Sequence, residues 1–240
     1  MKILVIDDEK PTLSMFKLFL TAYGYQVFVA DDGKTGVELF AKENPHIVFT
    51  DLKMPGIDGI EVLRRVRSFD DPKTQVIVIT GHGDMEKAIE ALDLDASDFI
   101  NKPVEKRALE SALKRAELRI KSCEMKPSEL ILDKTSDTTL CMRISGKFAA
   151  PFRLDGDFEH CGSDLTTLDN FDGIDKLDIY FSPDFSINRD GIDWLISFMG
   201  QVRDKKVSIT MKGLSYNYIR FFQMVGLHEI ATIVEAKYDE

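Results

Sequence analysis

The stretch that most constrains this chain runs from His46 to Gly59 and reads HIVFTDLKMPGIDG. Its first half is a short β-branched and aromatic run, which is typical of a buried strand. The pairs Asn44-Pro45 and Pro55-Gly56 bound this strand, so Asp51 stands where the strand stops. Ligands of open parallel sheets bind beyond the carboxyl ends of the strands, and an aspartate at this point is therefore well placed for chemistry.

Similar short strands alternate with helices throughout the first half of the chain. Besides this strand, we expect strands at residues 2–6, 26–30, 75–80 and 97–100, and an amphipathic helix follows each strand. The helix after the second strand is expected at residues 35–42, with Val37, Phe40 and Ala41 facing the core. Five strands alternating with five helices predict an α/β fold with a doubly wound parallel sheet and right-handed crossovers.

Unusual polar residues lie at the ends of four of these strands, and a parallel sheet brings those ends to one edge. They are Asp7, Asp8, Asp51, Thr80 and Lys102. Helix capping explains any single acid in this set, but it gives no reason for a lysine before proline or for a threonine that ends the fourth strand. Carboxylate oxygens hold a hard cation, while an ammonium and a hydroxyl contact phosphate oxygens. The set therefore predicts a Mg²⁺ and phosphoryl site.

Four motifs carry a resemblance to a known family. In their order and spacing, IDDEK, FTDLKMPGIDG, VIVITGHGD and DFINKP resemble the CheY-like receiver domain of two-component response regulators, which has a flavodoxin-like fold. The resemblance covers residues 1–122. It implies that Asp51 is the phospho-acceptor, and that Asp7, Asp8 and Asp51 bind Mg²⁺ or Mn²⁺ together with the main-chain carbonyl of Lys53.

The resemblance also assigns a switch. It implies that Thr80 is the hydroxyl that contacts the phosphoryl group, that Lys102 is its ammonium partner, and that Phe99 is the aromatic ring whose rotamer follows the state. Phosphorylation of Asp51 would shift a pre-existing equilibrium of the surface formed by the fourth helix, the fifth strand and the fifth helix. The sequence departs from the family pattern at Asp95, where glycine is common, and this brings the local turn geometry into question.

The end of the first half is a helical segment with two interpretations. Residues 105–121 keep an apolar stripe surrounded by charges and run on toward Pro127, which is expected to stop the helix. The segment is either a terminal helix packed on its own sheet or an extended helix that signals or forms a homodimer. We place the first domain at residues 1–122, a linker at 123–128 and the second domain at 129–238.

The second half also alternates strands and helices, with less regular spacing. Strands are expected at residues 129–132, 140–145, 177–181, 207–211 and 230–234, and helices at 191–202 and 215–225. Residues 147–170 are loop-rich and receive no assignment. The order predicts a mixed sheet with helices packed against it. Because no arrangement typical of an enzyme emerges, we expect no catalytic output beyond the receiver's own phosphorylation and dephosphorylation.

The order of these elements resembles the STAS fold of anti-sigma factor antagonists over about residues 128–237. MRISGKF is similar to its second strand, LDIYFSPDFSINRDGIDWLISFM to the strand, loop and helix that carry its switch, and VSITMKGLSYNYIRFFQMVGL to its closing unit. The family's phosphorylated loop typically reads Asp-Ser-Ser-Gly, whereas this output loop has Asn188, Arg189, Asp190 and Gly191. Asp190 stands where the regulatory serine would be, and we expect it to cap the following helix. Asp51 is then the phosphorylation switch of the chain.

The chain's one tryptophan, Trp194, lies away from the centre of the apolar stripe of its helix. The stripe is expected to consist of Ile192, Leu195, Ile196, Met199 and Val202. Either Trp194 packs beneath a neighbouring loop, or it anchors a partner, because tryptophan is common in interface hot spots.

Charge and hydropathy limit the partners of the chain. The formal net charge is −10, of which −3 falls on residues 1–121 and −7 on the remainder, so neither a basic face nor nucleic-acid binding is expected. No apolar run approaches the length of a membrane span, and the apolar run in the opening MKILVIDDE is too short for a signal peptide. We therefore expect a cytoplasmic protein without membrane contact. The three cysteines lack the spacing of a zinc site or a disulfide framework.

These observations predict a two-component response regulator. It would accept a phosphoryl group from a sensor histidine kinase or a phosphotransfer protein, and would control a protein partner through its STAS-like domain. A transcriptional output would need a basic recognition helix, which the acidic second half disfavours. An enzymatic output would need a further metal or nucleotide motif after residue 125. A haloacid-dehalogenase-type phosphatase would show D-x-D-x-T after the first strand, but residues 7–11 read Asp-Asp-Glu-Lys-Pro.

Overall fold

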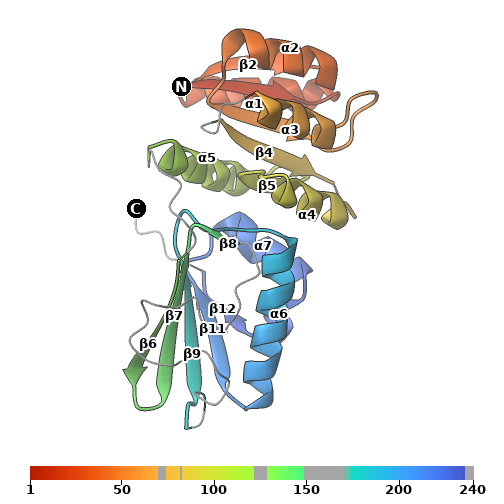
Figure 1. The fold of residues 1–240 in the computed structure, drawn as a ribbon. Helices are drawn as coiled ribbons and strands as arrows, with labels where there is room; N and C mark the ends of the chain where they lie inside the picture. Colours follow the sequence, from red (N-terminus) through yellow and green to blue (C-terminus); the bar gives the residue numbers. More distant parts are fainter. Residues whose placement is uncertain (70–73, 82, 122–128, 149–170, 172, 236–240) are drawn as a thin grey trace. The chain divides into compact units, whose positions relative to one another are not determined.

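The computed structural model describes residues 1–69, 74–81, 83–121, 129–148, 171 and 173–235. The chain divides into two compact units, Met1–Cys123 and Glu124–Glu240 (Figure 1). The expected linker and nearly all of the loop-rich segment lie outside the described residues. Among the described residues, no helix combines the length and the apolar character needed to cross a bilayer.

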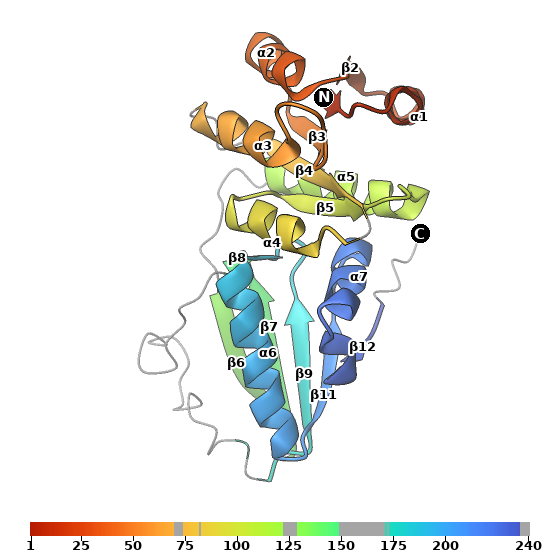
Figure 2. The same ribbon diagram turned by 90° about the vertical axis from the view of Figure 1, so that its right-hand side faces the viewer.

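The N-terminal unit is the expected five-stranded parallel sheet, with strand order β2-β1-β3-β4-β5. The strands are β1 (Lys2–Ile6), β2 (Gln26–Ala30), β3 (Ile47–Asp51), β4 (Gln75–Thr80) and β5 (Asp98–Asn101). The helices are α1 (Lys10–Ala22), α2 (Gly33–Glu43), α3 (Gly59–Ser68), α4 (Met85–Asp93) and α5 (Lys106–Lys121). Helices α2, α3 and α4 cover one face of the sheet and α1 and α5 the other (Figure 2). The sheet is therefore doubly wound, as the strand and helix alternation predicts.

The central strands are buried because helices cover both of their faces. Every residue of β3 and β4 is buried, which accounts for their nearly continuous apolar sequences. Helix α1 turns Leu13, Phe16 and Leu20 to the sheet, as its apolar spacing predicts, and the Phe16 ring lies 5.3 Å from the ring of Phe49. Full burial of each such side chain contributes about 1.5–3 kcal/mol to folding.

Helix α2 differs from the prediction in its start and in its buried face. It begins at Gly33, and Gly33, Gly36 and Phe40 are buried, whereas Val37 is half-buried and Ala41 is exposed. The reason is close packing at Gly36, where an added Cβ would lie 2.5 Å from the Cδ1 atom of Ile6. The backbone of α2 can approach β1 only on its glycine side, and this rotates Ala41 to solvent.

Two glycines, Gly33 of α2 and Gly59 of α3, lie so close to the β3–α3 connection that neither has room for a side chain. A Cβ at Gly59 would lie 2.2 Å from the main-chain oxygen of Asp51, and one at Gly33 would lie 2.3 Å from that of Ile57. Both contacts involve backbone atoms, which cannot rotate away. The glycines therefore set the path of the chain directly after Asp51.

The departure from the family pattern at Asp95 has a structural counterpart. Asp95 follows α4 and has a φ of +70°, in the left-handed region that glycine enters freely. The Arg67 guanidinium donates hydrogen bonds of 2.8 and 3.3 Å to the Asp95 carbonyl, which holds the turn in this conformation. Asp95 thus adopts a backbone conformation that is typical of glycine.

Helix α5 packs on its own sheet. Its apolar stripe, which includes Leu109 and Leu113, is buried, and Arg115 forms a buried ion pair of 3.1 Å with Asp98 of β5. The Tyr25 hydroxyl also donates a 2.6 Å hydrogen bond to Glu117 from the segment between α1 and β2. These contacts agree with the terminal-helix interpretation. The continuation toward Pro127 lies outside the described residues, so a signalling or dimerising extension stays a prediction.

The C-terminal unit is a mixed α/β domain. Its main sheet has strand order β12-β11-β9-β7-β6, in which β6 and β7 form an antiparallel hairpin and the other pairs are parallel. The strands are β6 (Glu129–Ser136), β7 (Thr139–Ser145), β9 (Lys176–Phe181), β11 (Ser208–Lys212) and β12 (Thr232–Ile233), and the helices are α6 (Arg189–Asp204), α7 (Tyr216–Met224) and the 3₁₀ turn η2 (Leu227–Glu229). Two short strands, β8 (Lys147–Phe148) and β10 (Ser186–Ile187), form a separate parallel pair.

Both helices of this unit lie on the same face of the sheet (Figure 2). The side chains that β9 turns to this face, Leu177, Ile179 and Phe181, are buried, and Phe181 contacts Phe222 of α7 with ring centres 5.7 Å apart. The last strand is shorter than predicted because the Ile230 and Ala231 amides donate to the Leu227 carbonyl. The chain reaches the sheet only at β12.

Trp194 is half-buried against other aromatic rings of the unit. Its ring stacks on Phe198 at 4.9 Å with an interplanar angle of 7°, and meets the edge of Phe148 in β8 at 5.4 Å. Phe198 belongs to the buried stripe of α6, whereas Ile196, expected in that stripe, is only half-buried. These contacts agree with the packing interpretation, and a role of Trp194 in partner binding stays a prediction.

The glycine contact behind Asp51 leads to a stability prediction. We expect Gly59→Ala to lower the free energy of unfolding of the N-terminal unit by about 3 kcal/mol or more, because the new methyl group must displace backbone. Gly24→Ala is the control, since Gly24 has a φ of +85° but open space around it, and should cost only about 1 kcal/mol. Denaturant unfolding measures both, and equal costs would contradict the backbone-contact explanation.

Candidate functional site

The polar residues predicted to converge do so at the carboxyl edge of the N-terminal sheet. Asp51 ends β3, Thr80 ends β4, and Asp7 and Lys102 directly follow β1 and β5. Asp7 and Asp51 are buried, whereas Asp8 is exposed. Carboxylate oxygens of these three aspartates lie within 4.8 Å of one another. This acidic site is the arrangement that the strand-end pattern predicts.

Lys102 supplies the positive charge at the centre of the site. Its ammonium lies 2.8 Å from Asp51 Oδ2, 3.2 Å from Asp7 Oδ2 and 3.2 Å from Glu9 Oε2. The sequence pattern did not single out Glu9, although it follows the two aspartates directly. Glu9 occupies the N-cap position of α1 without capping it through its side chain, and contacts the lysine instead.

The protonation equilibria of these groups reflect burial and mutual charge. Burial raises the pKa of Asp7, and the Glu9 amide and the Lys102 charge only partly oppose this effect. Burial also works against the charged form of Lys102, but the hydrogen bond and charge of Asp51, with the charge of Asp7, outweigh it, so that the pKa of Lys102 is raised. The ammonium therefore remains protonated at neutral pH.

The acidic site has the properties expected of a divalent-cation site. The Oδ2 atom of Asp7 is fully buried and makes no hydrogen bond, with only the Lys102 ion pair beside it. Buried carboxylate oxygens without hydrogen-bond donors are costly unless a cation neutralises them. The three aspartates supply hard oxygen donors at one point, as Mg²⁺ prefers. The Lys53 amide donates a 3.4 Å hydrogen bond to Asp51 Oδ1, which places the Lys53 peptide at the same site.

Thr80 and Phe99 adopt defined positions at the neighbouring strands. The Thr80 hydroxyl donates a 2.7 Å hydrogen bond to the side-chain oxygen of Asn101, the residue paired with it in β5. The Phe99 ring is fully buried. Sequence reasoning missed Asn101, although its place directly before Lys102 was the available signal.

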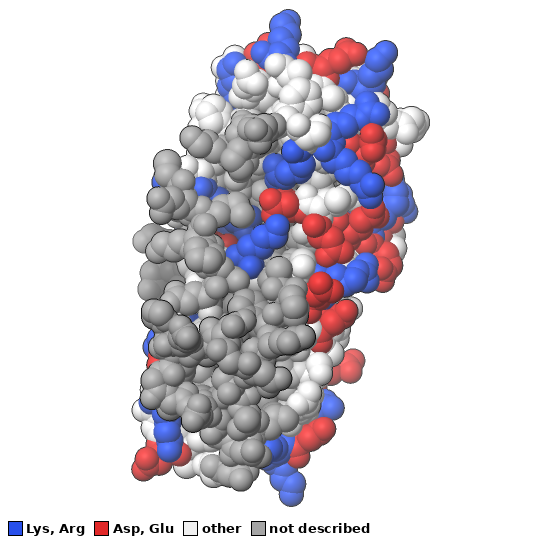
Figure 3. All heavy atoms as spheres, viewed as in Figure 1, with Lys and Arg blue, Asp and Glu red and all other residues white. Residues whose placement is uncertain are grey.

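Two lysine–aspartate pairs join the connection after β3 to Asp84, which directly precedes α4, and to Lys87 in the first turn of α4. Lys53 Nζ lies 2.5 Å from Asp84 Oδ1, and Lys87 Nζ lies 3.2 Å from Asp58 Oδ2. Asp58 also caps α3 by accepting a 3.0 Å hydrogen bond from the Glu61 amide. The surface of the N-terminal unit that Figure 3 presents carries both acidic and basic side chains.

The output loop lies at the start of α6, and its capping residue differs from the prediction. Asn188 is the N-cap, because its side-chain oxygen accepts a 2.9 Å hydrogen bond from the Gly191 amide. Asp190, predicted to cap the helix, is an exposed residue of the first turn, and Arg189 is also exposed. The β8 strand packs so closely here that a Cβ at Gly191 would lie 2.7 Å from the Phe148 carbonyl oxygen.

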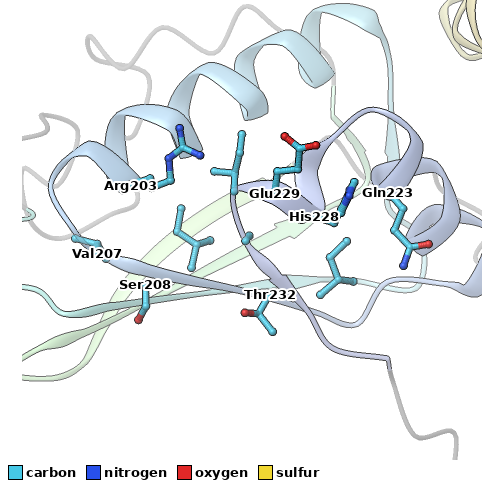
Figure 4. Close-up of a pocket in the computed structure, with 11 residues that line it drawn as sticks. Arg203, Val207, Ser208, Gln223, His228, Glu229 and Thr232 are labelled. Carbon is cyan, nitrogen blue, oxygen red and sulfur yellow. The ribbon is translucent and has the colours of Figure 1, made fainter.

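A separate hollow of about 510 Å³ lies in the C-terminal unit beside β11 and β12 (Figure 4). Arg203 of α6, His228 and Glu229 surround it, above a floor that includes the buried Val207 and Ile209. No residue of the output loop lines it. Sequence reasoning gave no signal for this hollow, because its lining comes from five separate elements, α6, β11, α7, η2 and β12.

Known proteins resemble the N-terminal unit. Residues 3–114 match the response regulator receiver domain family. The regulatory protein AtoC of Escherichia coli is 35% identical over 115 residues, which cover 48% of this chain and 25% of AtoC. The transcriptional regulatory protein FixJ of Bradyrhizobium diazoefficiens is 36% identical over 124 residues, which cover 50% of this chain and 60% of FixJ. The chain thus spans less than two thirds of the length of either curated relative.

A solved structure has a similar match. A response regulator receiver domain protein from Clostridium thermocellum is 36% identical, with a TM-score of 0.49, and the match covers 51% of this chain and 98% of that one. The family match ends at residue 114, so it assigns no family to the C-terminal unit.

The three clustered aspartates lead to a metal-binding prediction. We expect Mg²⁺ to raise the free energy of unfolding of the N-terminal unit, by about 1.4 kcal/mol at about ten times its dissociation constant. Asp8→Ala should remove this gain, whereas Glu38→Ala, an exposed acid on α2, should keep it. Denaturant unfolding with and without Mg²⁺ measures the effect. An equal gain in wild type and Asp8→Ala would contradict the site.

Proposed function

Residues 3–114 are a response regulator receiver domain, and on this premise we propose that Asp51 accepts a phosphoryl group from a sensor histidine kinase or a phosphotransfer protein. A carboxylate oxygen of Asp51 forms the new P–O bond. The P–N bond of the donor's phosphohistidine breaks, and its electron pair stays on the histidine nitrogen. Water later hydrolyses the aspartyl phosphate, which returns Asp51 to its carboxylate form.

The surroundings of Asp51 are the observation that carries this proposal. Its carboxylate ends a buried strand, 2.8 Å from the Lys102 ammonium and beside the oxygens of Asp7 and Asp8. Mg²⁺ or Mn²⁺, held by Asp7, Asp8, Asp51 and the Lys53 carbonyl, would supply charge neutralisation for an anionic nucleophile that approaches an anionic phosphoryl group. Lys102 then contacts a phosphoryl oxygen at the position where it now contacts Asp51.

The switch that we propose runs through Thr80 and Phe99. The added phosphate offers the Thr80 hydroxyl a charged acceptor in place of Asn101, and a charged acceptor makes the stronger hydrogen bond. Movement of Thr80 leaves space that the Phe99 ring fills by changing its rotamer. The phosphate thereby biases a pre-existing equilibrium of the α4, β5 and α5 surface.

We propose that the C-terminal unit is a STAS-like output domain that binds a protein partner and carries no catalysis of its own. An antiparallel hairpin followed by parallel strands, with α6 and α7 on one face, supports this proposal. The output loop begins α6, but Asp190 provides a fixed charge in place of a phosphorylatable serine. Asp51 then supplies the regulation, and phosphorylation changes the affinity of the output domain for its partner.

A transcriptional output is the second candidate, because AtoC and FixJ are named as regulatory and transcriptional regulatory proteins. The charge of this chain disfavours it. Helix α6 carries three aspartates and two arginines, and α7 carries a single arginine, so neither is a basic helix suited to the DNA backbone.

An affinity capture experiment tests the proposed function. The full chain and its Asp51→Ala variant are each used as bait, with and without Mg²⁺ and a small phosphodonor. We expect the donor to change the amount of one protein partner at least about tenfold for wild type, in line with a coupling energy of about 1.4 kcal/mol, and to leave Asp51→Ala unchanged.

In the same assay, the Asp190→Ala variant separates the donor response of the N-terminal unit from partner binding by the C-terminal unit. It should still respond to the donor, while its affinity for the partner changes. Recovery of DNA without a protein partner would contradict the STAS-like output. A donor response that persists in Asp51→Ala would contradict the acceptor assignment.

A further inference from the structure

Asp84 occupies a helix-capping position but does not cap its helix. It precedes α4, and its side chain accepts no hydrogen bond from the first turn of that helix. The comparable aspartates Asp32 and Asp58 do cap α2 and α3. A capping side chain stabilises a helix by about 1 kcal/mol, so Asp84 forgoes this contribution.

Both carboxylate oxygens of Asp84 contact the connections beside the site instead. Its Oδ2 atom accepts a 3.1 Å hydrogen bond from the amide of Gly81, the residue directly after Thr80. Its Oδ1 atom lies 2.5 Å from the ammonium of Lys53, two residues after Asp51. Only 6% of the Asp84 side chain is exposed, so water weakens this ion pair less than it would a surface pair.

Lys53 brings a positive charge close to Asp51, and the Asp84 carboxylate neutralises that charge. The Lys53 amide donates to Asp51 Oδ1, so the backbone of the lysine lies at the site, while its side chain extends to Asp84. The site itself gathers the carboxylates of Asp7, Glu9 and Asp51 around the Lys102 ammonium, and the Asp8 carboxylate lies beside those of Asp7 and Asp51. A phosphoryl donor that approaches this excess of negative charge would benefit from a further ammonium.

We propose that Asp84 is a positioning residue that holds the Lys53 ammonium away from Asp51 and thereby slows phosphoryl uptake. This inference rests on the proposed function of Asp51. Without the Asp84 charge, the flexible Lys53 side chain is free to move toward the donor phosphoryl group. Without Lys53, the Asp84 carboxylate stays unpaired beside the site and repels the donor. The two changes therefore have opposite effects on the rate.

The test measures phosphoryl uptake by the full chain with phosphoramidate and Mg²⁺, using intact-mass spectrometry over time. Asp84→Asn keeps an oxygen for the Gly81 amide but loses the charge, and we expect uptake to be about threefold faster or more. Lys53→Met leaves the main-chain carbonyl in place, and we expect uptake to be about threefold slower or more. The double variant should lie between the two single variants, and added salt should reduce all the differences.

Lys87→Met provides the matched control. It breaks the other lysine–aspartate pair, in which Asp58 of the same connection contacts Lys87 of α4 itself, so uptake should stay within about twofold of wild type. Thermal unfolding of each variant establishes whether it folds. Lys53 is mostly exposed, so Lys53→Met tests the inference even if Asp84→Asn does not fold.

The outcomes separate this inference from the proposed function. Opposite changes in the two single variants support the positioning role. Two results overturn it and show that the ion pair is purely structural. The first is a change of the uptake rate in the same direction in both single variants. The second is a shift of the unfolding temperatures while the uptake rates stay at the wild-type value. In either case, loss of uptake in Asp51→Ala still supports the acceptor assignment. If wild type takes up no phosphoryl group, both the proposed function and this inference fail.

Discussion

The contact of the Lys102 ammonium with the carboxylates at the sheet edge is the interaction on which the site depends. A parallel sheet brings the ends of β1, β3 and β5 to one edge, and in this chain the first two ends carry acids. Asp7 and Asp51 are both buried, so their mutual repulsion is weakly screened by water. Lys102 lies 2.8 Å from Asp51 and 3.2 Å from Asp7 and offsets part of that repulsion. The part that remains makes the site attractive to a divalent cation.

The path of the backbone after Asp51 is also constrained. Gly59 and Gly33 lie against the backbone oxygens of Asp51 and Ile57, so the β3–α3 connection follows one path. The Lys53–Asp84 and Asp58–Lys87 pairs then tie this connection to the start of α4. In the function that we propose, a change in charge at Asp51 reaches the start of α4 through these two pairs.

Sequence reasoning located the residues whose roles depend on strand ends. Asp7, Asp51 and Thr80 could be placed because a buried parallel strand fixes where its last residue lies, and the sheet then brings those residues together. The fold of the N-terminal unit followed from the same alternation. The sequence also predicted a mixed sheet for the C-terminal unit, although not the two-residue length of β12 or the contribution of Phe198 to the α6 stripe.

The direction in which individual side chains point could not be predicted from the sequence. Glu9 and Asp84 both occupy N-cap positions, and only the structure shows that their side chains contact lysines instead. Asn188 and Asp190 are both good capping residues two positions apart. Because α6 begins at Arg189, Asn188 is the cap. Ala41 was misplaced because the glycine face of α2, rather than its larger side chains, packs on β1.

Borohydride trapping of the phosphorylated chain shows which residue carries the phosphoryl group. Borohydride reduces an aspartyl phosphate to homoserine, and peptide mass spectrometry locates the converted residue. After treatment with phosphodonor and Mg²⁺, we predict homoserine at position 51 and nowhere else in the chain. Homoserine at position 7, 8 or 190, or a phosphoryl group carried on a serine, would contradict it.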